Sequence, residues 1–359
     1  MSLAEKIVSQ CLDVTSKDNV TIFFYSHNIP LAEEIADQCF KKGADVLLNL
    51  YTDKYYLSYV TNLSVESLRQ PSVFCQALTA NSSVEIWMPG TYDPTILRKI
   101  PAEKSAAVDE GEAKAHWPLS KEKKVRSLFV GTSMLTEPRA KTYGFNYQRW
   151  KRMTEAAANV DYDLLAKTGR KLKASLEGAK TIYVKGRGGT DLTLDMTGSK
   201  WHISDGIVDK TDIKEENFGD EVPAGSIYAA PRQKGAQGRV IFNASTPYHG
   251  INLKKIQLSF RDGRVTQFFT DAASKVARNE WKAAKGDKDK IALFGIGFNP
   301  KAEPGYTSNN IVGGAVTIGI GANQDIGGKN KPGFFFVDQV IGATVKADGK
   351  TVIKQGRIV

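Results

Sequence analysis

The chain has 359 residues and a mass of 39.3 kDa, which is longer than one hydrophobic core usually grows and predicts two domains. Hydrophobic residues at 41% and charged residues at 25% exclude a mostly disordered, collagen-like or membrane-embedded chain. The 49 Lys and Arg outnumber the 39 Asp and Glu, and the net charge of +10 favours an anionic ligand or partner without choosing among nucleic acid, membrane surface and small carboxylates.

The sequence contains no apolar run typical of an export signal or of a membrane span. Its three cysteines, Cys11, Cys39 and Cys75, are an odd number without a CxxC pair. Such usage argues against a disulfide framework and against a thiolate metal site. We therefore expect a cytoplasmic protein that does not contact a membrane.

The first half of the chain alternates strand and helix patterns. An apolar run at 20–25 predicts a buried strand, and a helical pattern follows it from Pro30 to Gly43. Further strands are predicted at 45–51, 84–88 and 127–131. Strand, helix, strand units form parallel strands with right-handed crossovers. The prediction is an α/β domain with an open, mostly parallel sheet.

The pattern changes after a long helical stretch at about 149–172. Short strands with glycine or Asp-Gly turns are predicted at 181–196, 256–268 and 343–353, and one further helix at 270–284. The second half is therefore predicted to be a mainly β (α+β) domain. We place the domains at residues 1–170 and 171–359.

Basic and aromatic residues alternate between Arg139 and Arg152, as a groove for single-stranded nucleic acid would require. The alternative is an amphipathic helix that begins near Trp150 and turns its charges to water. We favour the helix, so nucleic acid is not the expected partner.

Four strings in the second half occur in an order that resembles the M29 metallo-aminopeptidase family and the related ring-cleaving 2,5-dihydroxypyridine dioxygenases. The strings are VPAGSIYAAPRQKGAQGRVIF at 222–242, FGIGFNPKA at 294–302, GGAVTIGIG at 313–321 and GGKNKPGFFFVD at 327–338. The resemblance implies an M29 aminopeptidase-like fold and a homodimer. The first half agrees with the family only in its α/β layout.

The resemblance also implies where metal ligands would stand. Peptidases of this family carry a Glu at the position of Ser226 and a His at the position of Thr317. At the position of Leu293, the peptidases carry a Glu and the dioxygenases a His. Divalent transition metals need at least three ligands from His, Cys, Asp or Glu. These positions supply none.

The last string of the family carries a His-x-Asp pair. The matching residues are Phe336 and Asp338 if one extra residue is allowed after Asn330, and Phe335 and Val337 if it is not. Neither pair contains a histidine, and Asp338 alone would not retain an ion. We therefore expect no metal and no cofactor.

A substitute site would have to come from distant segments, because no two of the four histidines share a ligand spacing. These are His27, His116, His202 and His249. His249 is predicted on a loop near the family's cleft, and His27 at the carboxyl end of a parallel strand, where open α/β sheets bind ligands. A surface turn and a helix entry are the alternatives for these two histidines.

The glycine-rich loop at 327–331 favours an anion site. Consecutive glycines let backbone N–H groups converge on an anion, and Lys329 and Lys331 add positive charge. The alternative is a plain glycine turn with solvated lysines. The candidate ligand-binding residues are Lys329, Asn330, Lys331, Asn299, Tyr306, His249, Ser226 and Asp338.

These observations predict a divergent M29-like protein without the metal centre and without peptidase activity. It would bind or process a small anionic or peptide-like molecule in the inter-domain cleft, and no catalytic residue is assigned. One alternative is an active metal-dependent hydrolase with substitute ligands. A second is a nucleic-acid-binding or structural subunit.

Overall fold

The computed structural model describes residues 1–244, 246–248, 251–272, 274–331 and 333–359. The chain forms two compact units. Unit 1 comprises Met1–Lys151 and Gly206–Pro223, and unit 2 comprises Arg152–Asp205 and Ala224–Val359. The domain boundary near residue 170 stays a prediction.

Unit 1 contains a parallel sheet of five strands in the order β2-β1-β3-β4-β8. Its strands are β1 (Asn19–Tyr25), β2 (Asp45–Tyr51), β3 (Val84–Met88), β4 (Arg126–Val130) and β8 (Gly219–Val222). Every neighbouring pair is parallel. Five consecutive residues of β1 are buried, because both faces of a parallel sheet are covered. The predicted open parallel sheet is confirmed.

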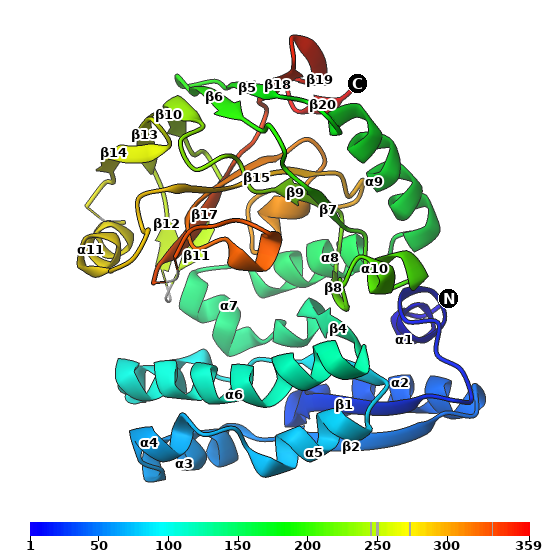
Figure 1. Cartoon of the computed structure of the whole chain (residues 1–359). Coiled ribbons are helices and arrows are strands. Elements are labelled where there is room, and N and C mark those ends of the chain that lie inside the picture. The colour runs from blue at the N-terminus through cyan, green and yellow to red at the C-terminus, as the bar shows by residue number, and fades with distance from the viewer. Residues whose placement is uncertain (245, 249–250, 273, 332) are drawn as a thin grey trace. The chain divides into compact units, whose positions relative to one another are not determined.

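Helices precede β1 and connect the strands of this sheet. They are α1 (Leu3–Lys6), η1 (Ile7–Cys11), η2 (Ser26–Asn28), α2 (Ile29–Lys41), α3 (Asp53–Asn62), α4 (Val65–Leu68), α5 (Val73–Asn81), η3 (Pro94–Lys99), α6 (Ala102–Lys123), η4 (Gly131–Met134), α7 (Glu137–Tyr143) and α10 (Lys210–Lys214). Helix α6 packs beside α4 and α5 (Figure 1). A Cβ on Gly111 would lie 2.1 Å from the Leu68 carbonyl oxygen, so only glycine permits this close packing.

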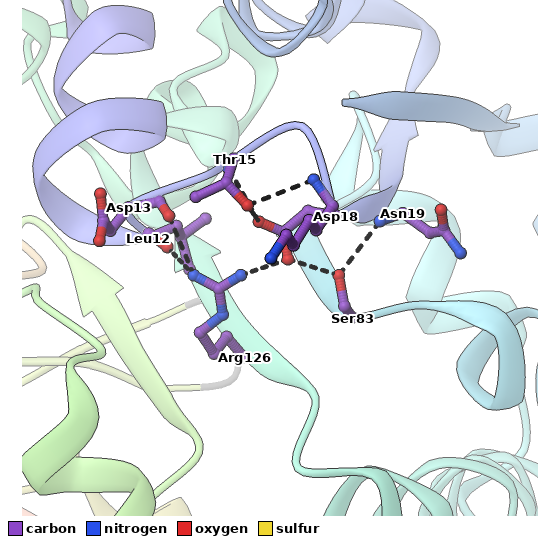
Figure 2. A network of polar contacts seen from close by, with 8 residues as sticks. Leu12, Asp13, Thr15, Asp18, Asn19, Ser83 and Arg126 are labelled. Carbon is purple, nitrogen blue, oxygen red and sulfur yellow. Dashed lines mark hydrogen bonds and ion pairs between the residues drawn. The ribbon is translucent and has the colours of Figure 1, made fainter. Parts of the chain in front are cut away.

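An ion pair joins the amino ends of three strands of unit 1 (Figure 2). Arg126, the first residue of β4, donates to Asp18 Oδ1 at 2.5 Å and to the Leu12 carbonyl oxygen. Asp18 also accepts hydrogen bonds from Thr15 N at 2.8 Å and from Ser83 Oγ at 2.7 Å. Since Asp18 precedes β1 and Ser83 precedes β3, one carboxylate fixes three strand starts relative to one another.

Unit 2 is built mainly from antiparallel strands. An eight-stranded sheet has the order β14-β13-β10-β6-β5-β18-β19-β20, a five-stranded sheet has the order β17-β16-β15-β9-β7, and β11 pairs with β12. The strands are β5 (Thr181–Lys185), β6 (Asp191–Asp195), β7 (Trp201–Ser204), β9 (Ser226–Ala229), β10 (Ala236–Ile241), β11 (Thr246–Tyr248), β12 (Ile251–Leu253), β13 (Gln257–Arg261), β14 (Arg264–Phe269), β15 (Ile291–Gly297), β16 (Val316–Gly321), β17 (Phe335–Val340), β18 (Thr344–Ala347), β19 (Lys350–Lys354) and β20 (Arg357–Ile358). The predicted mainly β region is confirmed.

The helical stretch predicted as one element at 149–172 is two helices, α8 (Tyr147–Ala158) and α9 (Tyr162–Leu176). The break lies at Asp161, whose side chain accepts a hydrogen bond from the backbone N–H of Leu164 and so caps the start of α9. The remaining helices are α11 (Lys275–Ala283), η5 (Asn309–Ile311) and η6 (Gln324–Ile326). No helix among the described residues is long and apolar enough to span a membrane.

The two large sheets of unit 2 share an aromatic core. Phe336 of β17 lies with its ring centroid 5.6 Å from that of Phe268 of β14 and 6.3 Å from that of Phe242. Phe336 is 2% exposed. One face of the five-stranded sheet is therefore packed as core.

Candidate functional site

The four strings that carry the family resemblance each contribute to one strand of the five-stranded sheet. These strands are β9, β15, β16 and β17, which are neighbours in the order β17-β16-β15-β9, and the first string also contains β10 of the eight-stranded sheet. Since cross-strand neighbours in an antiparallel sheet share a face, the pairing register decides which residues meet.

The register brings Ser226, Leu293 and Thr317 to one face, here called the candidate face. Ser226 is opposite Gly297, Thr317 is opposite Gly295 and Leu293 is opposite Gly319. A Cβ on Gly295 would lie 3.5 Å from Thr317 Cβ. One on Gly319 would lie 3.0 Å from Leu293 Cβ and 2.8 Å from Val337 Cγ1, so Val337 belongs to the same face.

Asp338 and Phe336 lie on the opposite face. In the pairing of β17 with β16, Asp338 is opposite Ile318 and Phe336 is opposite Ile320. These positions alternate along the strand with Val337 of the candidate face, so their side chains point to the other side of the sheet. Asp338 is 1% exposed, and its Oδ1 accepts the backbone N–H of Gln339 at 2.8 Å. The register therefore favours the alignment without an extra residue, in which Phe335 and Val337 occupy the family's His-x-Asp positions.

The candidate face does not fit the metal that the family implies. Its ligand positions hold the hydroxyls of Ser226 and Thr317 and the hydrocarbon side chains of Leu293, Val337 and Phe335. Neutral hydroxyls are poor ligands for zinc, cobalt or iron, and hydrocarbon offers no lone pair. Within the described part of the chain, no three His, Cys, Asp or Glu side chains could hold a metal ion.

The loop at 327–331 presents its lysines to solvent and buries its asparagine. Lys329 and Lys331 are exposed, whereas Asn330 is fully buried. The Asn330 Nδ2 donates to the carbonyl oxygens of Ile291 and Gly321, both at 2.8 Å. Both amide N–H donors of Asn330 are thus used to fasten the loop to β15 and β16.

Asn299 has a similar structural role. Its Nδ2 donates to the carbonyl oxygens of Ala157 at 3.0 Å and Ala224 at 2.7 Å, and its Oδ1 accepts the backbone N–H groups of Lys301 and Ala302. Tyr306 is half-buried beside Met153 and Ala157 in a small hollow. His249 lies outside the described residues.

A wide groove of unit 2 contains cations that the sequence patterns did not single out. Its volume is about 1000 Å³, and three of its ten lining residues are basic, namely Arg187, Lys354 and Arg357, whereas none is acidic. The side chains of Asn243 and Gln355 add polar groups to its wall. The ten lining residues come from five separate segments of the chain, which is why no local motif revealed them.

The basic and aromatic stretch at 139–152 does not form an exposed stacking surface. Trp150 is 2% exposed and its ring centroid lies 5.4 Å from that of Phe145. Arg139 is 7% exposed. Because single-strand binding needs accessible rings, this geometry favours the amphipathic helix.

Comparisons with known proteins agree with the arrangement of strands. The profile of the thermophilic metalloprotease (M29) family matches residues 1–286. The chain is similar in structure to wild-type AmpT from Thermus thermophilus, with a TM-score of 0.76, 14% identity, and coverage of 99% of this chain and 98% of that one. It is also similar to the 2,5-dihydroxypyridine dioxygenase from Pseudomonas putida KT2440, with a TM-score of 0.64, 13% identity, and coverage of 99% and 96%.

Comparison with curated proteins found no match. The two structural similarities concern the fold, whereas the profile match extends over most of the sequence. The chain therefore belongs to the thermophilic metalloprotease (M29) family.

Proposed function

We propose that this member of the M29 family acts without the family's divalent metal and binds a small anionic or peptide-like molecule. The single observation that carries the proposal is the donor set of the candidate face, where Ser226, Leu293, Thr317, Phe335 and Val337 stand at the implied ligand positions. Without three strong ligands, no metal-bound hydroxide forms to attack a peptide bond.

The charge of unit 2 supports an anionic ligand. Arg187, Lys354 and Arg357 line the groove without an acidic residue beside them, so a carboxylate would meet an uncompensated positive field. Arginine binds carboxylates through two parallel hydrogen bonds, which adds orientation to attraction. The groove is also large enough for a molecule of metabolite or short-peptide size.

The loop at 327–331 is a separate candidate contact for the ligand, because it precedes β17 whereas Ile341 and Gly342 of the groove follow that strand. Lys329 and Lys331 would supply charge, while Asn330 and Asn299 would hold the backbone in place. Ser226, Tyr306, His249 and Asp338 remain candidate contacts. A homodimer and a cytoplasmic location remain predictions.

Metal analysis and a peptidase assay test the loss of the metal centre. The purified full chain is equilibrated with Co²⁺ or Zn²⁺, desalted, analysed for bound metal and offered aminoacyl fluorogenic substrates. We expect well below one metal per chain and no turnover above the buffer rate. Stoichiometric metal with turnover would instead support an active hydrolase with substitute ligands.

Calorimetry with succinate and with the dipeptide Ala-Ala tests the ligand. We expect the double variant Arg187→Gln/Arg357→Gln to weaken binding about ten-fold or more, and Arg170→Gln, an exposed arginine of α9, to leave it unchanged. Unchanged binding in the double variant removes the groove from the proposal. Unchanged binding in Lys329→Ala removes the loop.

A further inference from the structure

The carboxyl edge of the unit 1 sheet contains a buried cation without a counter-ion. Arg139 of α7 is 7% exposed, and its Nη2 donates to the Thr91 carbonyl oxygen at 2.9 Å. Its Nε has no hydrogen-bond partner, and no ion pair of Arg139 is found among the described residues. A guanidinium buried in this way is costly unless an anion joins it.

Three more polar atoms near this edge are buried and unpartnered. They are Thr91 Oγ1, Thr132 Oγ1 and His27 Nδ1. Thr91 is 3% exposed. The three residues follow β3, β4 and β1, which are neighbours in the sheet. Buried polar groups are nearly always hydrogen-bonded, so several orphans together with an unpaired arginine indicate a missing ligand.

Direct contacts join the loops that bear these groups. His27 Nε2 lies 2.9 Å from the Ser133 carbonyl oxygen, and Ser133 Oγ donates to the Pro89 carbonyl oxygen at 2.8 Å. The ring centroid of His27 is 5.6 Å from that of Tyr92. The unpartnered groups therefore belong to one edge, and this is the edge at which open α/β sheets bind ligands.

The unpartnered nitrogen of His27 narrows the choice of ligand. The Ser133 carbonyl oxygen calls for a proton on Nε2, whereas the Asn28 Nδ2, a donor 3.1 Å from the same Nε2, calls for a lone pair there and a proton on Nδ1. Burial lowers the pKa of His27, which keeps the ring neutral at pH 7. In either tautomer, His27 Nδ1 can form a hydrogen bond with a hydroxyl group, which both donates and accepts.

The local charge argues against a dianion. Asp53 already places a carboxylate at this edge, where it accepts the backbone N–H groups of Tyr92 at 2.8 Å and Asp93 at 2.9 Å. Arg139 and Asp53 together carry no net charge, so every negative charge of a ligand is added without a further cation to balance it. A monocarboxylate fits this balance better than a phosphate dianion.

We infer that Arg139, Thr91, Thr132 and His27 form a binding site for a small monocarboxylate that carries a hydroxyl group. The carboxylate pairs with Arg139 and the threonine hydroxyls, and the ligand hydroxyl forms a hydrogen bond with His27 Nδ1. This site belongs to unit 1 and is independent of the ligand proposed for unit 2.

Calorimetry on the full chain tests the site, with lactate as the probe and with propionate and inorganic phosphate as comparisons at constant ionic strength. We expect lactate to bind at least three-fold more tightly than propionate, which lacks the hydroxyl for His27, and more tightly than phosphate. Arg139→Gln should weaken lactate binding at least ten-fold, whereas Arg98→Gln, an exposed arginine of η3, should not change it.

Thr91→Val provides a second variant should Arg139→Gln fail to fold. Because Thr91 Oγ1 makes no hydrogen bond in the protein, this change removes none and should preserve the fold. We expect it to weaken lactate binding at least three-fold. Lactate binding that survives both variants, or that is lost in Arg187→Gln instead, would overturn the assignment, as would tighter binding of phosphate.

Discussion

Asp18→Asn should destabilise the protein through the loss of one buried charge. In the structure, Asp18 accepts hydrogen bonds from Thr15, Ser83 and Arg126, and the Asp18 and Arg126 side chains are 8% and 16% exposed. The amide keeps one acceptor but turns an N–H donor toward either Thr15 or Arg126. Removing one partner of a buried ion pair costs about 3–5 kcal/mol, and we expect about 3 kcal/mol because Arg126 retains some contact with water.

Urea denaturation followed by circular dichroism measures this loss. Asp37→Asn is the matched control, since it breaks an ion pair with Lys41 whose side chains are 58% and 62% exposed. Exposed pairs of this kind contribute less than about 1 kcal/mol. Equal unfolding free energies for the two variants would refute the reasoning.

The effect of Asp18→Asn should also depend on pH. Burial alone would raise the pKa of Asp18, but hydrogen bonds from Ser83, Thr15 and Arg126 outweigh burial and hold this pKa below its ordinary value. A carboxylate with a lowered folded-state pKa stabilises the protein above its unfolded pKa of about 3.9, and that stabilisation is lost as pH falls through the folded pKa. The difference between wild type and Asp18→Asn should thus be full at pH 7 and shrink below about pH 4. A difference that is constant with pH would contradict the assignment.

Three further predictions concern unit 2. Placing the family's ligands on the candidate face, as Ser226→Glu/Leu293→Glu/Thr317→His/Phe335→His/Val337→Asp, should create measurable Co²⁺ binding by calorimetry. The same background with Phe336→His in place of Phe335→His and Val337→Asp keeps only three of the five ligands on this face and should bind Co²⁺ more weakly, and tighter binding by this second variant would show that the register is misread. Asn330→Ala should lower the free energy of unfolding by about 2–4 kcal/mol, because the carbonyl oxygens of Ile291 and Gly321 lose a buried donor. The control Lys329→Ala, at an exposed side chain, should change this free energy by less than about 0.5 kcal/mol. Equal melting temperatures for the two variants would argue against the proposed role of Asn330 in holding the loop to β15 and β16. Gly263→Ala should lower the free energy of unfolding, measured by chemical denaturation, more than Gly349→Ala does. Both glycines have positive φ, but a Cβ on Gly263 would lie 1.9 Å from the Gln233 carbonyl oxygen, whereas a Cβ on Gly349 meets nothing within 4 Å. Equal losses of stability would contradict this steric argument.

Local patterns predicted several elements of the fold, whereas long helices such as α6 and the strand β8 were not predicted. The apolar run at 20–25 became β1, and the Asp-Gly pairs at 262–263 and 348–349 became hairpin turns with positive φ at all four residues. The break between α8 and α9 was missed, because the helical periodicity continues through Asp161 and only its capping hydrogen bond reveals the stop. Helix capping depends on a side-chain conformation that composition does not specify.

The candidate face was harder to predict from the sequence than the fold, because its composition depends on the register between β15, β16 and β17. Phe336 and Phe335 differ by one position, yet one packs into the aromatic core and the other lies on the candidate face. Asn299 and Asn330 were predicted to contact a ligand, because a side-chain amide can bind a ligand or hold a loop in place. The sequence alone does not show the backbone carbonyl groups to which these two amides donate. The groove cations and the unpaired Arg139 come from segments far apart in the chain, which no local motif can bring together.

Strand β8 has a consequence for how the protein is synthesised. It completes the sheet of unit 1 beside β4, but it belongs to Gly206–Pro223, which follows β5, β6 and β7 of unit 2 in the sequence. While the ribosome is still producing the segment before Gly206, β4 has an open edge whose N–H and C=O groups can pair with another nascent chain. The molecule must therefore pass through a stage vulnerable to aggregation, and a chaperone that shields β4 during translation should raise the yield of folded protein.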